Sequence, residues 1–207
     1  MTHHRAALTV LSCVVLGASC RSPQSHFYTL SATATPATIA SSLSIAVGPV
    51  SVPTVVDRPE IVVSTGPNEV WPDDFNRWAS PLQDNLSRAV AENLVAILGT
   101  SRVSLFPQTL SSGADYRVAI EVRRFESTPG KTAILDASWS VRRKDDNTQT
   151  GRTEVTEEVH GSNYDALAAA HSRAVTKLSQ DIAQAIGALH ASDLDLPRNT
   201  DAIQPSH

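Results

Sequence analysis

The side chains that could carry catalysis or hold a metal ion are few, and their spacing is unfavourable. Asp145-Asp146 lies in a predicted turn, and Glu157 and Glu158 point to opposite faces of a predicted strand, so neither pair forms an acid–base couple. No serine stands in a nucleophile-elbow context, and the chain has no Gly-rich phosphate loop. No two histidines after residue 20 have the helical spacing of metal ligands; they are His26, His160, His171, His190 and His207. The sequence therefore predicts a protein that is not an enzyme and that binds no metal or cofactor.

Cys20 is the residue that the sequence marks for covalent modification. It follows an apolar run, from Ala6 to Ala18, which is preceded by Arg5 and is too short to cross a bilayer as a helix, as in a secretory signal. The end of this run, Leu16–Cys20, resembles the lipobox of bacterial lipoproteins. That resemblance implies removal of residues 1–19 as a signal peptide, a diacylglycerol on the Cys20 thiol and an N-acyl chain on its amino group.

An alternative processing route remains open at the same bond. Gly17 and Ser19 are small residues in the two positions that an ordinary signal peptidase reads, and Gly17 stands where a lipobox usually has leucine. Either enzyme would remove Cys13 with the signal, which leaves Cys20 as the single cysteine and excludes an intramolecular disulfide.

Composition excludes several classes of partner. The chain carries a formal net charge of -4, has 5% aromatic residues and shows no cluster of Lys and Arg, which argues against nucleic acid and against a basic patch for anionic lipid. No later run is apolar enough for a membrane span, so any membrane contact is expected to run through Cys20.

The N-terminal part of the mature chain predicts a tether that leads into a first set of strands. Residues 20–42, rich in Ser, Thr, Ala and Pro, are expected to form the lipidated N-terminus and a flexible tether, in which only Phe27–Leu30 docks as a strand. Leu43–Val47 and Ile61–Val63 alternate or cluster as short strands. Gly48, Pro49 and Pro53 should confine the continuation of the first of these to a sheet edge or a loop.

Residues 64–80 contain many turn formers and are expected to be irregular. Trp71 and Trp78 lie within this stretch. They suit a binding loop, but they equally suit aromatic plugs where a loop crosses the core, and the sequence leaves both interpretations open.

Two helices and a strand meander complete the prediction. Ser80 and Pro81 are expected to begin a helix that ends at Gly99, and a second helix begins near Ser162 and carries His171 on its apolar stripe as a packing residue. Alternation predicts strands at 102–106, 116–122, 133–141 and 153–159. The fold class is α+β, with a largely antiparallel sheet and two amphipathic helices packed on one face, over residues 43–190. Residues 191–207 are expected to be a disordered tail.

Several segments together resemble a known family, the auxiliary lipoproteins of ABC-type transport systems (the PqiC-like lipoproteins). The resemblance extends over residues 20–190 and is carried by Phe27–Leu30, Asp57–Val62, Phe75–Leu82, Ala91–Leu94, Asp115–Val118, Trp139-Ser140 and Tyr164–Leu167.

The resemblance implies a lipid-anchored protein on the periplasmic face of the outer membrane, and Arg21 is not the Asp that retains lipoproteins in the inner membrane. It further implies a ring-shaped homo-oligomer that works with an envelope-spanning MCE-domain protein and an inner-membrane subunit, moving lipid or maintaining envelope integrity. We place partner contact within 57–82, at Arg58, Trp71, Phe75, Arg77 and Trp78. The alternatives are a soluble periplasmic carrier with lipid between helices and sheet, and an envelope-assembly lipoprotein unrelated to lipid transport.

Overall fold

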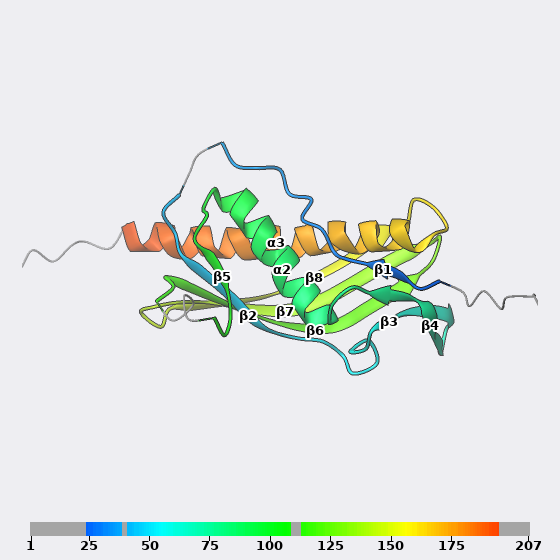
Figure 1. Ribbon diagram of the computed structural model, residues 1–207. Coiled ribbons are helices and arrows are strands. Elements are labelled where there is room, and N and C mark those ends of the chain that lie inside the picture. The colour runs from blue at the N-terminus through cyan, green and yellow to red at the C-terminus, as the bar shows by residue number, and fades with distance from the viewer. Residues whose placement is uncertain (1–23, 39–40, 109–112, 195–207) are drawn as a thin grey trace, which may run out of the picture.

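The computed structural model describes residues 24–38, 41–108 and 113–194, which form two sheets and two helices (Figure 1). The α+β class predicted from the sequence is confirmed, but the strands form two sheets rather than one. The smaller sheet has the order β1-β4-β3, with β1 His26–Tyr28, β3 Glu60–Gly66 and β4 Glu69–Trp78. The larger has the order β5-β2-β6-β7-β8, with β2 Ile45–Ser51, β5 Val103–Leu105, β6 Tyr116–Thr128, β7 Thr132–Arg143 and β8 Thr148–Glu158.

The predicted meander forms one side of the larger sheet. Strands β6, β7 and β8 pair antiparallel over their whole length, because each presents alternating apolar side chains to one face. The sheet is nevertheless mixed, since β2 runs parallel to both β5 and β6.

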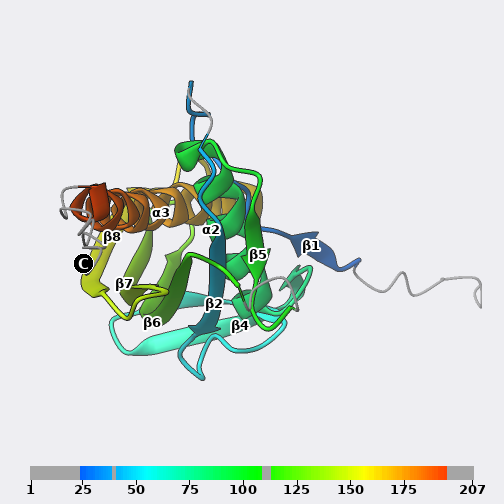
Figure 2. The same cartoon turned by 90° about the vertical axis from the view of Figure 1, so that its left-hand side faces the viewer.

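Both helices cover the same face of the five-stranded sheet (Figure 2). Helix α2, Leu82–Leu98, and helix α3, Tyr164–Leu194, bury the predicted apolar stripes against the strands and against each other. Gly99 ends α2 in the left-handed conformation, as expected. At its start the cap position is Pro81 with no side-chain hydrogen bond, so the expected Ser80 cap is wrong. Neither helix combines the length and apolarity that a membrane span requires.

Strand β2 confirms the prediction that Gly48 and Pro49 confine its continuation to a sheet edge. Residues Ile45–Val47 pair with β5 on one side and with β6 on the other, whereas the continuation from Gly48 to Ser51 pairs with β6 alone. Its pairing with β6 is interrupted between Val47 and Val50, so the proline falls where the ladder requires no donor from it.

The stretch 64–80, expected to be irregular, is mostly strand β4. It forms an antiparallel hairpin with β3, and the predicted turn formers Pro67 and Asn68 connect the two strands. Trp78 is buried while Trp71 is exposed, so the two tryptophans have different roles. The strand could not be recognised from the sequence, because turn-forming residues and the bulge interrupt its alternation.

The predicted tether also differs from the structure. Residues Thr29–Thr38, which we call the strap, run from β1 across α2 and α3 (Figure 1). Leu30 is fully buried, and the backbone N–H groups of Thr33 and Ala34 donate to the Asn93 Oδ1 atom at 3.2 and 3.0 Å. The strap is ordered because buried polar side chains of the helices satisfy its backbone. Residues 20–23 and the predicted tail after 194 lie outside the described residues, whereas α3 extends to Leu194, beyond the predicted start of that tail.

His171 lies where the two sheets and α3 meet. Its ring stacks on Phe125 with centroids 3.9 Å apart, and Phe125 in turn meets the edge of Trp78. The side chain is fully buried, with Nε2 2.8 Å from Ser127 Oγ. The packing role predicted for His171 is confirmed, and burial lowers its pKa to about 3.

Candidate functional site

A pocket of about 350 Å³ opens where two segments far apart in the sequence meet. One wall is Asp57-Arg58-Pro59, at the entry to β3, and the other is Trp78–Pro81, between β4 and α2. The walls are fixed by backbone hydrogen bonds, from Trp78 N to Pro59 O at 2.8 Å and from Ala79 N to Tyr28 O at 2.8 Å. Most of the lining is apolar and its backbone is held rigidly, which suits the docking of an apolar side chain.

Charged side chains flank this pocket. Glu60 lies between two guanidinium groups, 3.0 Å from Arg58 Nε and 3.2 Å from Arg77. The hydrogen bond from Arg58 is the main cause that lowers the pKa of Glu60, so this carboxylate stays ionised. Both arginines are partly exposed, which leaves their remaining N–H donors available to a partner's acceptors.

Trp78 lines the pocket but does not project from it. Its side chain is only 5% exposed, and its ring packs edge-on against Phe125 with centroids 6.1 Å apart. Trp78 is therefore a core residue whose indole supports the pocket from behind. The predicted role as a protruding anchor does not fit its burial.

A second surface of the small sheet is formed by exposed apolar side chains, which we call the aromatic edge. It comprises Phe27 of β1 and Val70, Trp71 and Phe75 of β4, which are 66, 49, 59 and 43% exposed. Isolated exposed apolar residues are ordinary, but these four follow one edge of the small sheet. The row runs from Phe27, opposite Arg77, to Val70 and Trp71 near the turn between β3 and β4, and it requires an explanation.

A bulge presents Phe75 at this edge. Along β4 the pairing with β3 jumps from Asp73 to Arg77, which leaves Asp74–Asn76 outside the ladder. The Asp73 carboxylate holds the bulge by accepting from the backbone N–H of Phe75 and of Asn76, each at 2.9 Å. The exposure of Phe75 is therefore built into the strand.

The bulge is also tied to α3. Tyr164 donates its hydroxyl to Asp73 Oδ2 at 2.7 Å, and Tyr28 donates to Asn76 Oδ1 at 2.8 Å. Partial burial opposes ionisation of Asp73, but the hydrogen bonds from Tyr164, Phe75 and Asn76 outweigh it and lower the pKa. Burial first, and then Asp73, raise the pKa of the Tyr164 phenol.

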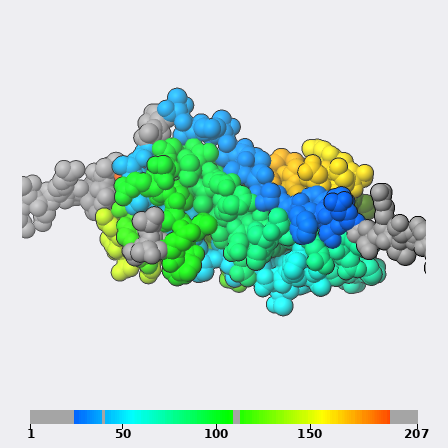
Figure 3. All heavy atoms as spheres, viewed as in Figure 1, coloured from blue at the N-terminus to red at the C-terminus, as the bar shows by residue number. Residues whose placement is uncertain are grey.

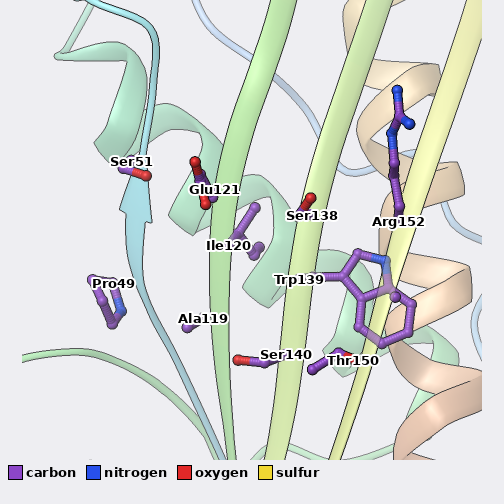
Figure 4. Close-up of a pocket in the computed structure, with 11 residues that line it drawn as sticks. Pro49, Ser51, Ala119, Ile120, Glu121, Ser138, Trp139, Ser140, Thr150 and Arg152 are labelled. Atoms are coloured by element: carbon purple, nitrogen blue, oxygen red, sulfur yellow. The ribbon is translucent and has the colours of Figure 1, made fainter.

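A larger, shallower hollow of about 720 Å³ lies on the five-stranded sheet, with α2 and α3 behind the strands in Figure 4. Gly151 is required there, because a Cβ atom at this position would come within 2.3 Å of the Trp139 ring. Arg152 borders the hollow and forms a bidentate pair with the buried carboxylate of Asp136. Most of its other lining side chains are short, such as Ala119, Ser138, Ser140 and Thr150, and none of the residues expected to bind a partner is among them.

The structure separates the predicted partner-binding residues into two groups. Arg58, Trp78 and, through Glu60, Arg77 belong to the pocket, whereas Trp71 and Phe75 belong to the aromatic edge. Sequence reasoning did not propose Phe27 or Val70 for partner contact. Both belong to short β-favouring runs, and only the pairing of β1 and β4 decides which of their side chains are exposed. The lipid-attachment residue Cys20 lies outside the described residues. Within the described part of the chain, no group of three or more His, Cys, Asp or Glu side chains is placed to hold a metal ion.

Comparison with known proteins identifies a family. Residues 28–183 match the family model described as "ABC-type transport auxiliary lipoprotein component". No curated protein sequence matches the chain.

Solved structures share the fold. One, a crystal structure of an uncharacterised protein, has 18% identity and a TM-score of 0.65, and covers 79% of this chain and 99% of its own. A Xanthomonas campestris protein of the family DUF330 has 22% identity and the same TM-score of 0.65, and covers 81% of this chain and 99% of its own. A PelC dodecamer from Paraburkholderia phytofirmans matches more distantly, with 15% identity, a TM-score of 0.40, and coverage of 75% and 92%.

Proposed function

The chain belongs to the family of ABC-type transport auxiliary lipoprotein components, and from this premise we propose that it is a non-catalytic, lipid-anchored subunit of an intermembrane transport system. In this proposal, Cys20 carries a diacylglycerol and an N-acyl chain that hold the domain to the periplasmic face of the outer membrane. The domain assembles as a homo-oligomeric ring, and it docks an envelope-spanning MCE-domain protein that connects to an inner-membrane subunit. The system would move lipid and so support envelope integrity.

The observation that carries the proposal is the match over residues 28–183 together with the lipobox-like stretch that ends at Cys20. The match covers the strap, both sheets apart from His26 and Phe27 of β1, and most of α3. A lipid anchor and a rigid domain whose N-terminal segment is fixed to its helices together suit a docking subunit, because such a domain holds its binding surface in a defined position.

We place the partner contact at the pocket between Asp57–Pro59 and Trp78–Pro81. The two segments that carry much of the family resemblance form its walls. An apolar pocket beside paired arginines fits a partner segment that inserts one apolar side chain and places a carboxylate or carbonyl near Arg58 or Arg77.

The carrier alternative meets a physical difficulty. The space that it assigns to lipid, between the helices and the five-stranded sheet, is occupied by buried side chains from both layers, among them Leu86, Leu94, Val118, Leu135 and Leu178. A lipid would have to displace this close-packed core. The envelope-assembly alternative shares the anchor and differs in its partner, so the partner experiment separates it from our proposal.

Blocking the pocket is expected to weaken partner capture at least about tenfold, the effect of losing a central contact worth about 1.4 kcal/mol. Ala79 lines the pocket and is exposed, so Ala79→Arg fills the space without touching the core. The measurement is the amount of MCE-domain protein, identified by mass spectrometry, that cross-links to the tagged lipoprotein in intact cells.

The matched control is Ala188→Arg, the same change on an exposed position of α3. It should capture the MCE-domain protein as the wild type does. Equal capture by wild type and Ala79→Arg would exclude the pocket as the contact, and the absence of any MCE-domain protein from the wild-type capture would contradict the proposed function.

A further inference from the structure

The aromatic edge lies at the end of the molecule from which the chain leads back to Cys20. The described chain begins at Gln24, immediately before β1, and β1 lies beside β4 in the small sheet (Figures 1 and 3). Phe27 is thus both a member of the aromatic edge and close in sequence to the proposed anchor.

The length of the connecting segment limits how far this edge can lie from the anchored residue. Gln24 is four residues from Cys20, and a fully extended chain spans about 14 Å over that distance. The strap fixes the chain after β1 to the helices, so residues beyond β1 add no length to the connection between Cys20 and the small sheet. A lipid on Cys20 therefore keeps the start of the described chain, which leads into β1 beside the aromatic edge, within about 14 Å of the anchored residue.

The chemistry of the edge fits the boundary between headgroups and acyl chains. Trp and Phe side chains are favoured at that boundary, where burial of their rings stabilises contact without a spanning segment. The chain is acidic, and exposed Glu69 and Asp74 are neighbours of the edge in β4. The contact must therefore depend on apolar burial rather than on attraction of cations to anionic lipid.

We propose that the aromatic edge, Phe27, Val70, Trp71 and Phe75, inserts into the surface of the membrane that holds the lipidated Cys20. This inference rests on the anchor in the proposed function and deepens it, since it fixes the orientation of the domain. With the small sheet against the bilayer, α3 and the long strands of the large sheet extend away from it (Figure 1).

The protein contains a natural reporter of this contact. Of its three tryptophans, Trp78 and Trp139 are 5 and 8% exposed, whereas Trp71 is 59% exposed. The experiment reconstitutes the lipidated full-length mature protein in phosphatidylcholine vesicles whose acyl chains carry bromine, which quenches only a tryptophan that reaches them. We expect quenching of the wild type and loss of most of that quenching in Trp71→Phe.

A second pair of variants tests the neighbouring side chains. Phe27→Ser with Phe75→Ser should lose most of the quenching of Trp71 while the protein still floats with the vesicles. The control is Phe106→Ser, which removes another exposed phenylalanine, 51% exposed, beside β5 in the other half of the molecule, and should leave the quenching unchanged. All four positions are exposed, so thermal unfolding should be nearly the same in each protein.

The outcomes distinguish this inference from the proposed lipid anchor on which it rests. Flotation with an unquenched Trp71 would overturn the membrane contact and leave the anchor intact, whereas a protein that does not float would contradict both. If Trp71 of the unlipidated Cys20→Ala protein becomes shielded as protein concentration rises, a second copy covers the edge and the inference is wrong.

Discussion

Replacing Asn93 by alanine is expected to destabilise the protein by about 3 kcal/mol and to release the strap. Asn93 is fully buried on α2, and its Oδ1 atom accepts from the backbone N–H of Thr33 and of Ala34 and from the Thr176 hydroxyl at 3.1 Å. Alanine would deprive the two strap N–H groups of this acceptor and would add a small cavity, whereas the Thr176 hydroxyl keeps the Ser172 carbonyl as an acceptor.

The strap depends on this acceptor more than on apolar contact. Beyond Leu30 its residues are mostly exposed, so hydrogen bonds to the helices hold it in place. Asn85 supports the other end of the strap, where it accepts from the Thr29 hydroxyl at 2.8 Å. Loss of Asn93 should therefore free the part of the strap after Leu30 first.

The measurement combines denaturant unfolding with hydrogen exchange of the strap amides. In Asn93→Ala the amides of Thr33 and Ala34 should exchange as fast as those of an open loop, while the strands of the meander stay protected. Glu92→Ala, at the neighbouring exposed position of α2, should change the free energy of unfolding by less than about 0.5 kcal/mol. Unchanged protection of Thr33 and Ala34 in Asn93→Ala would show that the strap is held by other contacts.

Acidification from pH 7 to pH 5 is expected to lower the free energy of unfolding by about 2 kcal/mol through His171 alone. Burial lowers the pKa of His171 to about 3 in the folded protein, while an unfolded histidine titrates near about 6.5. Between these values the unfolded chain binds a proton that the folded chain does not, so stability falls as pH falls. Above about pH 6.5 both states are neutral and the effect vanishes.

The range from pH 7 to pH 5 separates the effect of His171 on stability from that of the carboxylates. Asp73, Asp115 and Asp136 have lowered pKa values in the folded protein, so their stabilising effect is lost only in more acidic solution, below about pH 4 to 5. In His171→Gln, whose amide can still bond Ser127, the difference in unfolding free energy between pH 7 and pH 5 should shrink by about 2 kcal/mol. The exposed His160→Gln should keep the wild-type difference, and a His171→Gln protein that also keeps it would contradict the explanation.

Periodic segments predicted their structure well. The meander and both helices were foreseen because their apolar residues recur every second or every third to fourth position, and burial then follows from the pattern. Strand β4 was missed because Pro72 and the bulge at Asp74–Asn76 interrupt alternation. The edge position of β2 beyond Val47 was foreseen, because Gly48 and Pro49 are poorly suited to a strand that is paired on both sides.

The strap and the candidate site needed tertiary information. A flexible tether has the same Ser- and Thr-rich composition as the strap, so composition does not distinguish the two. The signal in the sequence is Asn85 and Asn93, two polar residues among the apolar positions of α2, which need polar partners when they are buried. Likewise Trp71 and Trp78 have similar sequence surroundings, but only the sheet pairing shows that one is core and the other is surface.

The most direct test of a lipid-anchored auxiliary subunit is the intact mass of the N-terminal peptide from membrane-extracted protein, measured beside a Cys20→Ala variant. The account predicts a peptide that begins at Cys20 and carries a diacylglycerol and an N-acyl chain, with both the added mass and membrane association lost in the variant. A peptide that begins at an unmodified Cys20, recovered from the soluble fraction, would contradict the account and with it the orientation proposed for the aromatic edge.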